Sequence, residues 1–140
     1  MSGDNLDQLC TRYGYRIAVD VYGAMKKAAE NHITKSLGVL QEDGVYAFAL
    51  YQVSRGKQEE EGAKKLKELA ERLLHDARVP PFNSNSVPDL LEGLRGDPQK
   101  RLKGLAEDLD SLLLAKRLLE QTLIYARYHA KSLGNREEKK

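Results

Sequence analysis

The chain has 140 residues, a formal net charge of +2 and a single cysteine, which favours one domain without an internal disulfide, suited to a reducing compartment. No cationic start leads into an apolar run, and no uncharged stretch is long enough to cross a membrane, so we expect neither a signal peptide nor a transmembrane segment. The composition therefore predicts a soluble cytoplasmic protein. Its 23 basic against 21 acidic residues are far from the balance of a dedicated nucleic-acid binder.

Apolar residues recur at spacings of three and four through the first 28 positions, which predicts a long amphipathic helix. The predicted buried stripe comprises Leu6, Leu9, Tyr13, Ile17, Val21, Ala24, Met25 and Ala28. Cys10 lies on the same side, and we expect it to be a small core residue rather than a nucleophile. Residues 33–42 predict a short second helix, which Gly38 weakens.

The segment Val45–Val53 contains no charged residue and could be a buried strand or a buried helix. Apolar residues occupy both alternating positions and few of them are β-branched, which favours a helix. Asp43 is a candidate N-cap, and Gly56 is a candidate C-terminal residue with positive φ. Because this helix is apolar around most of its circumference, we predict that it is a central pillar surrounded by the other helices.

The second half of the chain predicts a charged helix over residues 57–78, with Glu61–Lys65 and Lys64–Glu68 as candidate i,i+4 pairs. A loop over residues 79–86 follows, and Ser86 is a candidate cap for a short helix. Asp97 and Pro98 predict the start of a last helix that reaches Leu133, bent near Gly104.

These segments together predict an all-α fold: a single-domain bundle of six to seven helices around a central buried helix. The predicted domain covers residues 1–134, and a flexible charged tail covers residues 135–140.

Signs of catalysis are scarce. His32, His75 and His129 are far apart, with no second histidine four residues away and no cysteine pair, so their spacing excludes a structural zinc site. The acidic run EDLD at 107–110 could hold a metal, but acids in the first turn of a helix also complement its dipole, which we favour. No glycine-rich phosphate loop is present. We expect no enzyme, no catalytic residue, no metal and no cofactor; a small metal-dependent hydrolase is the least favoured hypothesis.

What remains is basic charge on helix surfaces. Residues 98–140 carry 10 basic and 6 acidic residues. On the last predicted helix a basic stripe opposes the apolar side, interrupted by Glu120 and bordered by Tyr128, and two arginines of the first helix lie away from its apolar stripe. Cations of this kind displace counterions from a phosphate backbone, and an aromatic side chain can stack on a base. An ordinary solvated face, or a contact with a partner protein, would give a similar pattern.

The stretch LGVLQEDGVYAFALYQVSRGK, residues 37–57, resembles the signature of the small helical subunit of the type III-B CRISPR effector, the Cmr complex. That family has a leucine-rich short helix, a glycine, and an Ala/Phe/Leu-rich buried helix ending in a small–basic–glycine turn. The matching residues here are Leu37, Leu40, Gly44, Ala47, Phe48, Ala49, Leu50, Arg55, Gly56 and Lys57.

The stretch LLLAKRLLEQTLIYARYHAKSL, residues 112–133, resembles the closing helix of the same family, with matches at Glu120, Leu123, Tyr125, Arg127 and Ala130. Two positions depart from the family pattern. Gly38 stands where the family often has a proline, and Tyr125 stands where it often has a tryptophan.

The resemblance implies a non-catalytic subunit that serves antiviral defence. In that family, copies stack in short rows along the guide–target RNA, basic faces contact the RNA backbone, and other subunits perform cleavage. The implied partners are the backbone and large Cmr subunits, further copies of the chain, and guide and target RNA. Candidate RNA contacts are Arg12, Arg16, Arg55, Lys57, Lys116, Arg127 and Lys131. The alternative is a helical protein–protein adaptor with no nucleic-acid role.

Overall fold

The computed structural model describes the backbone of residues 3–138 and the side chains of residues 5–136. Within that part of the chain there are six α-helices, two short 3-10 helices and no strand, apart from an isolated bridge between Asp97 and Leu102. The elements are, in order, α1 (Gly3–Met25), α2 (Ala28–Asp43), α3 (Val45–Val53), α4 (Glu60–Asp76), α5 (Leu90–Arg95), η1 (Pro98–Lys100), η2 (Leu105–Glu107) and α6 (Leu109–Glu138). The predicted all-α single-domain bundle is confirmed.

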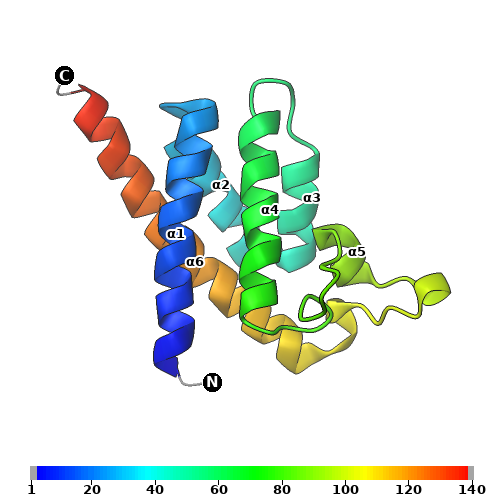
Figure 1. Cartoon of the computed structure of the whole chain (residues 1–140). Coiled ribbons are helices and arrows are strands. Elements are labelled where there is room, and N and C mark those ends of the chain that lie inside the picture. Colours follow the sequence, from blue (N-terminus) through cyan, green and yellow to red (C-terminus); the bar gives the residue numbers. More distant parts are fainter. Residues whose placement is uncertain (1–2, 139–140) are drawn as a thin grey trace.

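Helix α1 packs against three other helices. It stands beside α4, and α6 runs obliquely behind it (Figure 1). α1 also lies against α2, so three helices cover its apolar side, and Ile17, Ala18 and Val21 are at most 1% exposed. The predicted stripe of the first helix is thus confirmed through Met25, whereas Ala28 is exposed and begins α2.

Helix α3 forms where it was predicted, but it is not a central pillar. Its inward side is buried at Val45, Phe48 and Ala49, while Tyr46, Leu50 and Val53 are 42%, 43% and 50% exposed. α3 packs on α2 and α4 at the edge of the bundle (Figure 1), and a helix at an edge has an outward face whatever its composition. The expectation of a surrounded central helix is therefore wrong.

The junctions on either side of α2 each contain a residue with a positive φ angle. Lys26 has φ +54° at the turn from α1, and α2 begins at Ala28, five residues before the predicted start at 33. Gly44 has φ +97° and precedes α3 as its N-cap, and its N–H donates to the Leu40 carbonyl at 3.0 Å. Asp43 belongs to α2 instead of capping α3, and Ser54, not Gly56, ends α3.

The segment between α4 and α6 differs most from the prediction. Asp89, not Ser86, caps α5 by accepting the Leu91 N–H at 3.2 Å. Asp97 is an N-cap and Pro98 follows it, as predicted, but the helix that Asp97 caps is the three-residue η1 and not the last long helix. Residues 101–108 are not part of a last helix, because the backbone doubles back and crosses itself at Gly104. A Cβ on that glycine would lie 2.5 Å from the Leu94 carbonyl oxygen.

Helix α6 begins at Leu109 and continues through Glu138. The chain is therefore helical over the first four residues of the segment 135–140 that the sequence predicted as a tail. The apolar side of α6 supplies Ala115, Leu119, Leu123 and Ala126 to the common core, which leaves its opposite side facing outward.

Candidate nucleic-acid interface

The predicted cations of α6 lie on the side of the helix that faces away from α1. Helix α6 meets α1 at Leu118, whose carbonyl accepts the Cys10 thiol at 3.5 Å, and at His129, whose ring lies 5.4 Å from that of Tyr15. Lys116 and Lys131 are each two residues from one of these contacts, and two residues advance a helix by about 200°. The basic stripe is thus turned away from the α1 side.

Arg127 fits the same arrangement. It is two residues from Tyr125, whose Cβ would lie 2.7 Å from a Cβ placed on Gly14 of α1. Its guanidinium carbon lies 5.2 Å from the centre of the Tyr128 ring, and Tyr128 is 62% exposed. An open aromatic ring therefore accompanies the cations.

The outward surface of α6 is nearly free of acidic residues. Between residues 111 and 135 the helix carries four basic side chains and one acidic residue, Glu120. Glu120 lies 3.8 Å from Lys116, and a half-buried i,i+4 pair at this distance restrains the lysine only weakly. We call this surface the α6 basic face; its members are Lys116, Arg127, Tyr128 and Lys131. Arg117 lies apart from it, because it borders a hollow with Leu6, Asp7 and Cys10 of α1.

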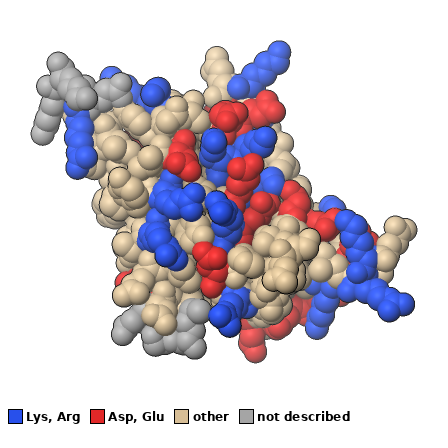
Figure 2. All heavy atoms as spheres, in the orientation of Figure 1, with Lys and Arg blue, Asp and Glu red and all other residues tan. Residues whose placement is uncertain are grey.

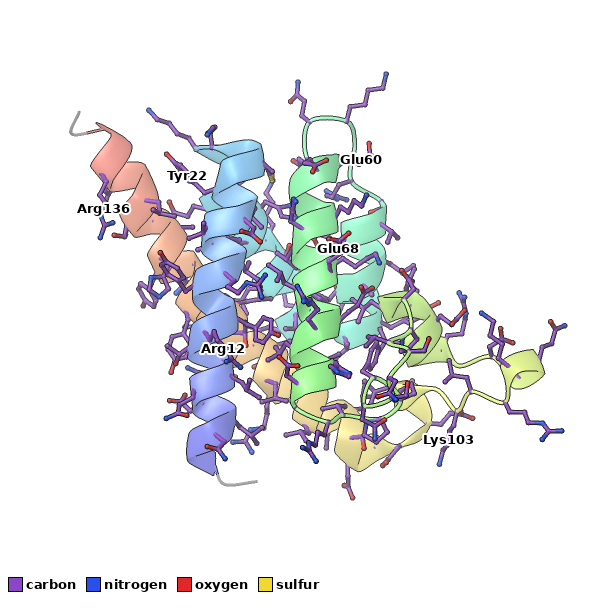
Figure 3. All side chains as sticks on the ribbon, in the orientation of Figure 1. Arg12, Tyr22, Glu60, Glu68, Lys103 and Arg136 are labelled. Atoms are coloured by element: carbon purple, nitrogen blue, oxygen red, sulfur yellow. The ribbon has the colours of Figure 1, made fainter. Side chains whose placement is uncertain are left out.

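Arg12 and Arg16 do not join the α6 basic face. They lie on the side of α1 that faces α4, with guanidinium carbons 5.7 Å and 5.9 Å from the centre of the Tyr13 ring. Figure 3 shows Arg12 on the near side of α1, in front of the oblique α6. The sequence prediction grouped cations that the fold places on two different sides of the molecule.

Arg55 and Lys57 lie in a third place, the loop between α3 and α4. The Arg55 guanidinium lies 3.8 Å from the centre of the Tyr51 ring. Its Nε donates to the Tyr51 carbonyl at 3.0 Å, and it pairs with Glu59 at 3.6 Å. Arg55 is thus engaged in holding the end of α3, whereas Lys57 is exposed.

Arg72 of α4 is a basic residue that the sequence reasoning missed. It is four residues before Asp76 in α4, and Asp76 accepts the hydroxyl hydrogen of Tyr13, so Arg72 lies on the side of α4 that faces α1. No sequence signal identified it, because the side of α4 that faces α1 depends on how the two helices pack. Neither predicted pair of α4, Glu61–Lys65 or Lys64–Glu68, forms an ion pair among the described residues.

The acidic run at 107–110 has local structural contacts. The Glu107 carboxylate accepts the Gly104 N–H at 2.8 Å. The Asp108 carboxylate accepts the Ser111 hydroxyl at 2.8 Å, and this hydrogen bond lowers the pKa of Asp108. Within the described residues no group of three or more His, Cys, Asp or Glu side chains is placed to hold a metal ion.

The three histidines are separate in space as well as in sequence. His32 is buried against Gln52, with 2.9 Å between the His32 Nε2 and the Gln52 Oε1. His75 Nδ1 lies 2.8 Å from the Phe82 carbonyl oxygen, and His129 lies against Tyr15. Each is engaged by a different part of the core or its edge, and none shares a site with another.

The chain matches no family model, no curated protein and no solved structure. The resemblance to the small Cmr subunit therefore stays a prediction drawn from residues 37–57 and 112–133. None of the described helices has the combination of length and apolar character needed to cross a lipid bilayer.

Proposed function

We propose that this chain is a non-catalytic subunit that contacts an RNA backbone through the α6 basic face. The observation that carries the proposal is the arrangement of Lys116, Arg127 and Lys131 along one side of a long helix, with Tyr128 open beside them and Glu120 as the only acid between residues 111 and 135. Lys116 and Lys131 are separated along the helix axis by about 22 Å, a length that spans several phosphates of a nucleic acid.

The mechanism is electrostatic. Cations on the α6 basic face displace counterions condensed on the phosphates, and Tyr128 supplies a ring on which an unpaired base can stack. Contacts of this kind read no base sequence. Since each chain offers few cations, we expect weak, salt-sensitive binding by the isolated protein and stronger binding when several copies lie along one RNA.

The assembly that fits this role is the one implied by the resemblance: a small subunit stacked along guide and target RNA in a type III-B CRISPR effector. Purification of the native protein from its source cells, with identification of the co-purifying proteins and RNA, tests this assignment. Recovery of CRISPR guide RNA with the other effector subunits is expected. Recovery of the protein alone, or with unrelated partners and no RNA, would contradict it.

The RNA contact itself is tested with the triple variant Lys116→Gln, Arg127→Gln and Lys131→Gln. Loss of three phosphate contacts should flatten the plot of log affinity against log salt concentration by about two units for single-stranded RNA. The matched control is Lys27→Gln, Lys35→Gln and Lys64→Gln, which removes the same charge from three exposed lysines elsewhere. Equal slopes for the two variants would reject the α6 basic face as the RNA contact.

A protein–protein adaptor is the second candidate, and the exposed apolar residues favour it. Tyr46, Leu50 and Val53 lie open on α3, and Leu109 and Leu113 of α6 are 66% and 51% exposed. Charge reversal at Lys116, Arg127 and Lys131 separates the two functions. Loss of assembly with RNA affinity intact would support the adaptor, and loss of RNA affinity with assembly intact would support the RNA contact.

A further inference from the structure

Three arginines converge on one tyrosine where α1 meets α4. Arg12 and Arg16 lie within 6 Å of the Tyr13 ring, and Arg72 of α4 is one helical turn before Asp76, which accepts the Tyr13 hydroxyl hydrogen. Figure 2 shows basic side chains gathered over α1 and α4 in the middle of this face, with acidic ones around them. We call this group, with Asp76, the α1–α4 arginine cluster.

One carboxylate of this surface, that of Asp76, is engaged by Tyr13. Tyr13 donates its hydroxyl hydrogen to Asp76 Oδ2. Burial and the bond to Asp76 raise the pKa of Tyr13 to about 12, so the phenol stays a donor at neutral pH. Within the described residues Asp76 forms no ion pair, although Arg72 is four residues before it and Arg12 borders the same surface hollow.

None of the three arginines forms an ion pair with a described residue either. Arg12 and Arg16 are also four residues apart on one helix, a spacing at which like charges repel. Three guanidinium groups that form no ion pair with a described residue are suited to bind an anion from outside the chain. Guanidinium groups match phosphate oxygens in a fork of two hydrogen bonds, which favours phosphate over a simple halide.

The shape of the surface agrees with a ligand larger than one ion. A hollow of about 610 Å³ adjoins the cluster and is lined by Gln8, Leu9, Arg12 and Asp76 among others. It combines an apolar side chain with polar groups, so it has room for the sugar or base attached to a phosphate. This hollow lies at the side of α1 that faces α4, whereas the α6 basic face is turned away from the α1 side.

We propose that the α1–α4 arginine cluster is a second phosphate-binding site for RNA, separate from the α6 basic face. In this site Arg12, Arg16 and Arg72 contact the phosphate, and Tyr13 is a positioning residue that occupies Asp76 and keeps it from pairing with the arginines. The inference rests on the proposed function in one respect only, namely that RNA is the ligand that both surfaces bind. It adds a site on another side of the molecule, through which one chain can hold two RNA segments.

The main test compares Arg12→Gln, Arg16→Gln and Arg72→Gln with the charge-matched control Lys27→Gln, Lys35→Gln and Lys64→Gln. The probe is a short fluorescent oligouridylate, titrated by anisotropy across salt concentrations. We expect the cluster variant to lose about two units of salt slope relative to the control, and its effect to add to that of the α6 variant. A cluster variant that binds like the control overturns the second site, whatever the α6 variant does.

Two variants test Tyr13 and Asp76 with opposite expected signs. Tyr13→Phe removes no cation but releases Asp76 to pair with an arginine, so RNA affinity should fall by roughly two- to five-fold, the range expected for one exposed ion pair. Asp76→Asn removes the competing carboxylate, so affinity should rise by a similar factor. Unchanged affinity in both variants, or shifts of the same sign, overturns the role given to Tyr13.

Titration with inorganic phosphate distinguishes free phosphate from RNA as the ligand of the α1–α4 arginine cluster. Arginine Nε–Hε signals in the NMR spectrum of the full chain are followed during titration with phosphate and with the oligouridylate. Shifts of the Arg12, Arg16 and Arg72 signals with both ligands support the proposal. Shifts with phosphate alone overturn RNA as the ligand, and shifts with neither overturn the site. If the cluster variant loses affinity while the α6 variant binds as wild type, the second site stands and the proposed α6 contact fails.

Discussion

Helix α3, compared with α1 and its partner α6, shows that the average apolar content of a helix does not determine how much of the helix is buried. α3 carries no charge, yet three of its nine residues are at least 42% exposed apolar side chains. α1 carries Asp7, Arg12, Arg16 and Asp20, yet five residues of its stripe are at most 9% exposed: Leu9, Tyr13, Ile17, Val21 and Met25. The difference teaches that spacing decides which residues are covered, since a charged helix with a regular stripe is enclosed on one side as deeply as any apolar segment.

The two regions also attach differently to the rest of the fold. α1 and α6 approach closely at Gly14, where a Cβ would lie 2.9 Å from the Thr122 carbonyl oxygen. α3 attaches to α2 through a buried polar triad, in which Gln52 lies 2.9 Å from His32 and donates to Ser36 at 2.9 Å. Phe48, fully buried, provides the apolar part of the α3 contact.

The largest expected effect contrasts the two sides of α3. Phe48→Ala should lower the free energy of unfolding by about 3–5 kcal/mol, because it removes a buried ring and leaves a cavity. Leu50→Ala on the outward side should cost less than about 1 kcal/mol. Urea unfolding of both variants measures the contrast. Equal losses would show that the outward side of α3 is covered in solution.

The second contrast concerns α1 itself. Gly14→Ala places a methyl group 2.7 Å from the Tyr125 Cβ, and such overpacking costs about 1–3 kcal/mol, partly offset by the better helix propensity of alanine. The control is Gly23→Ala in the same helix, where nothing lies within 4 Å of the new methyl. That variant should gain about 0.5–1 kcal/mol. Thermal unfolding that moves both midpoints in the same direction would contradict the close approach of α1 and α6.

The sequence predicted the elements best where a regular apolar pattern is long. The stripe of α1, the helical state of α3 and the inner face of α4 with Leu66, Leu69 and Leu73 all follow from spacing and are confirmed. The position of a helix in the bundle does not follow from its own spacing, because it depends on which other helices cover it. An uncharged helix at the centre and one at an edge have the same local pattern.

Prediction failed where the path of the backbone is set by contacts outside the helices, between short segments that fold back on each other. The path of residues 96–108 depends on Asp97 pairing with Leu102, with N–H to carbonyl distances of 2.8 Å and 2.9 Å in the two directions, and on the crossing at Gly104. The candidate site shows the same limit. The stripe on α6 follows from periodicity within one helix, whereas the approach of Arg12 and Arg72 to the same Tyr13–Asp76 pair depends on how α1 and α4 pack.

A pH titration tests the polar attachment of α3. Burial lowers the pKa of His32, so between the folded and unfolded pKa values the unfolded chain binds more protons. Stability from this group is therefore present above the ordinary histidine pKa of about 6.5 and declines as pH falls below it, by at most about 1.4 kcal/mol per pH unit. His32→Gln keeps a donor toward Gln52 without a titrating ring. The variant should show a flatter pH dependence of unfolding than the wild type, and identical profiles would contradict the assignment.

The smallest expected effect concerns Arg55, which the sequence assigned to RNA and the fold engages at the end of α3. Arg55→Lys keeps the charge but removes the planar group over Tyr51 and the Nε donor to the Tyr51 carbonyl. We expect a loss of about 0.5–1 kcal/mol in unfolding free energy and little change in RNA affinity at low salt. Arg55→Gln separates the roles further. If Arg55 is a phosphate contact, its removal should flatten the salt slope as much as removal of Lys131 does; if it serves α3 alone, the slope should stay the same and only the stability should fall.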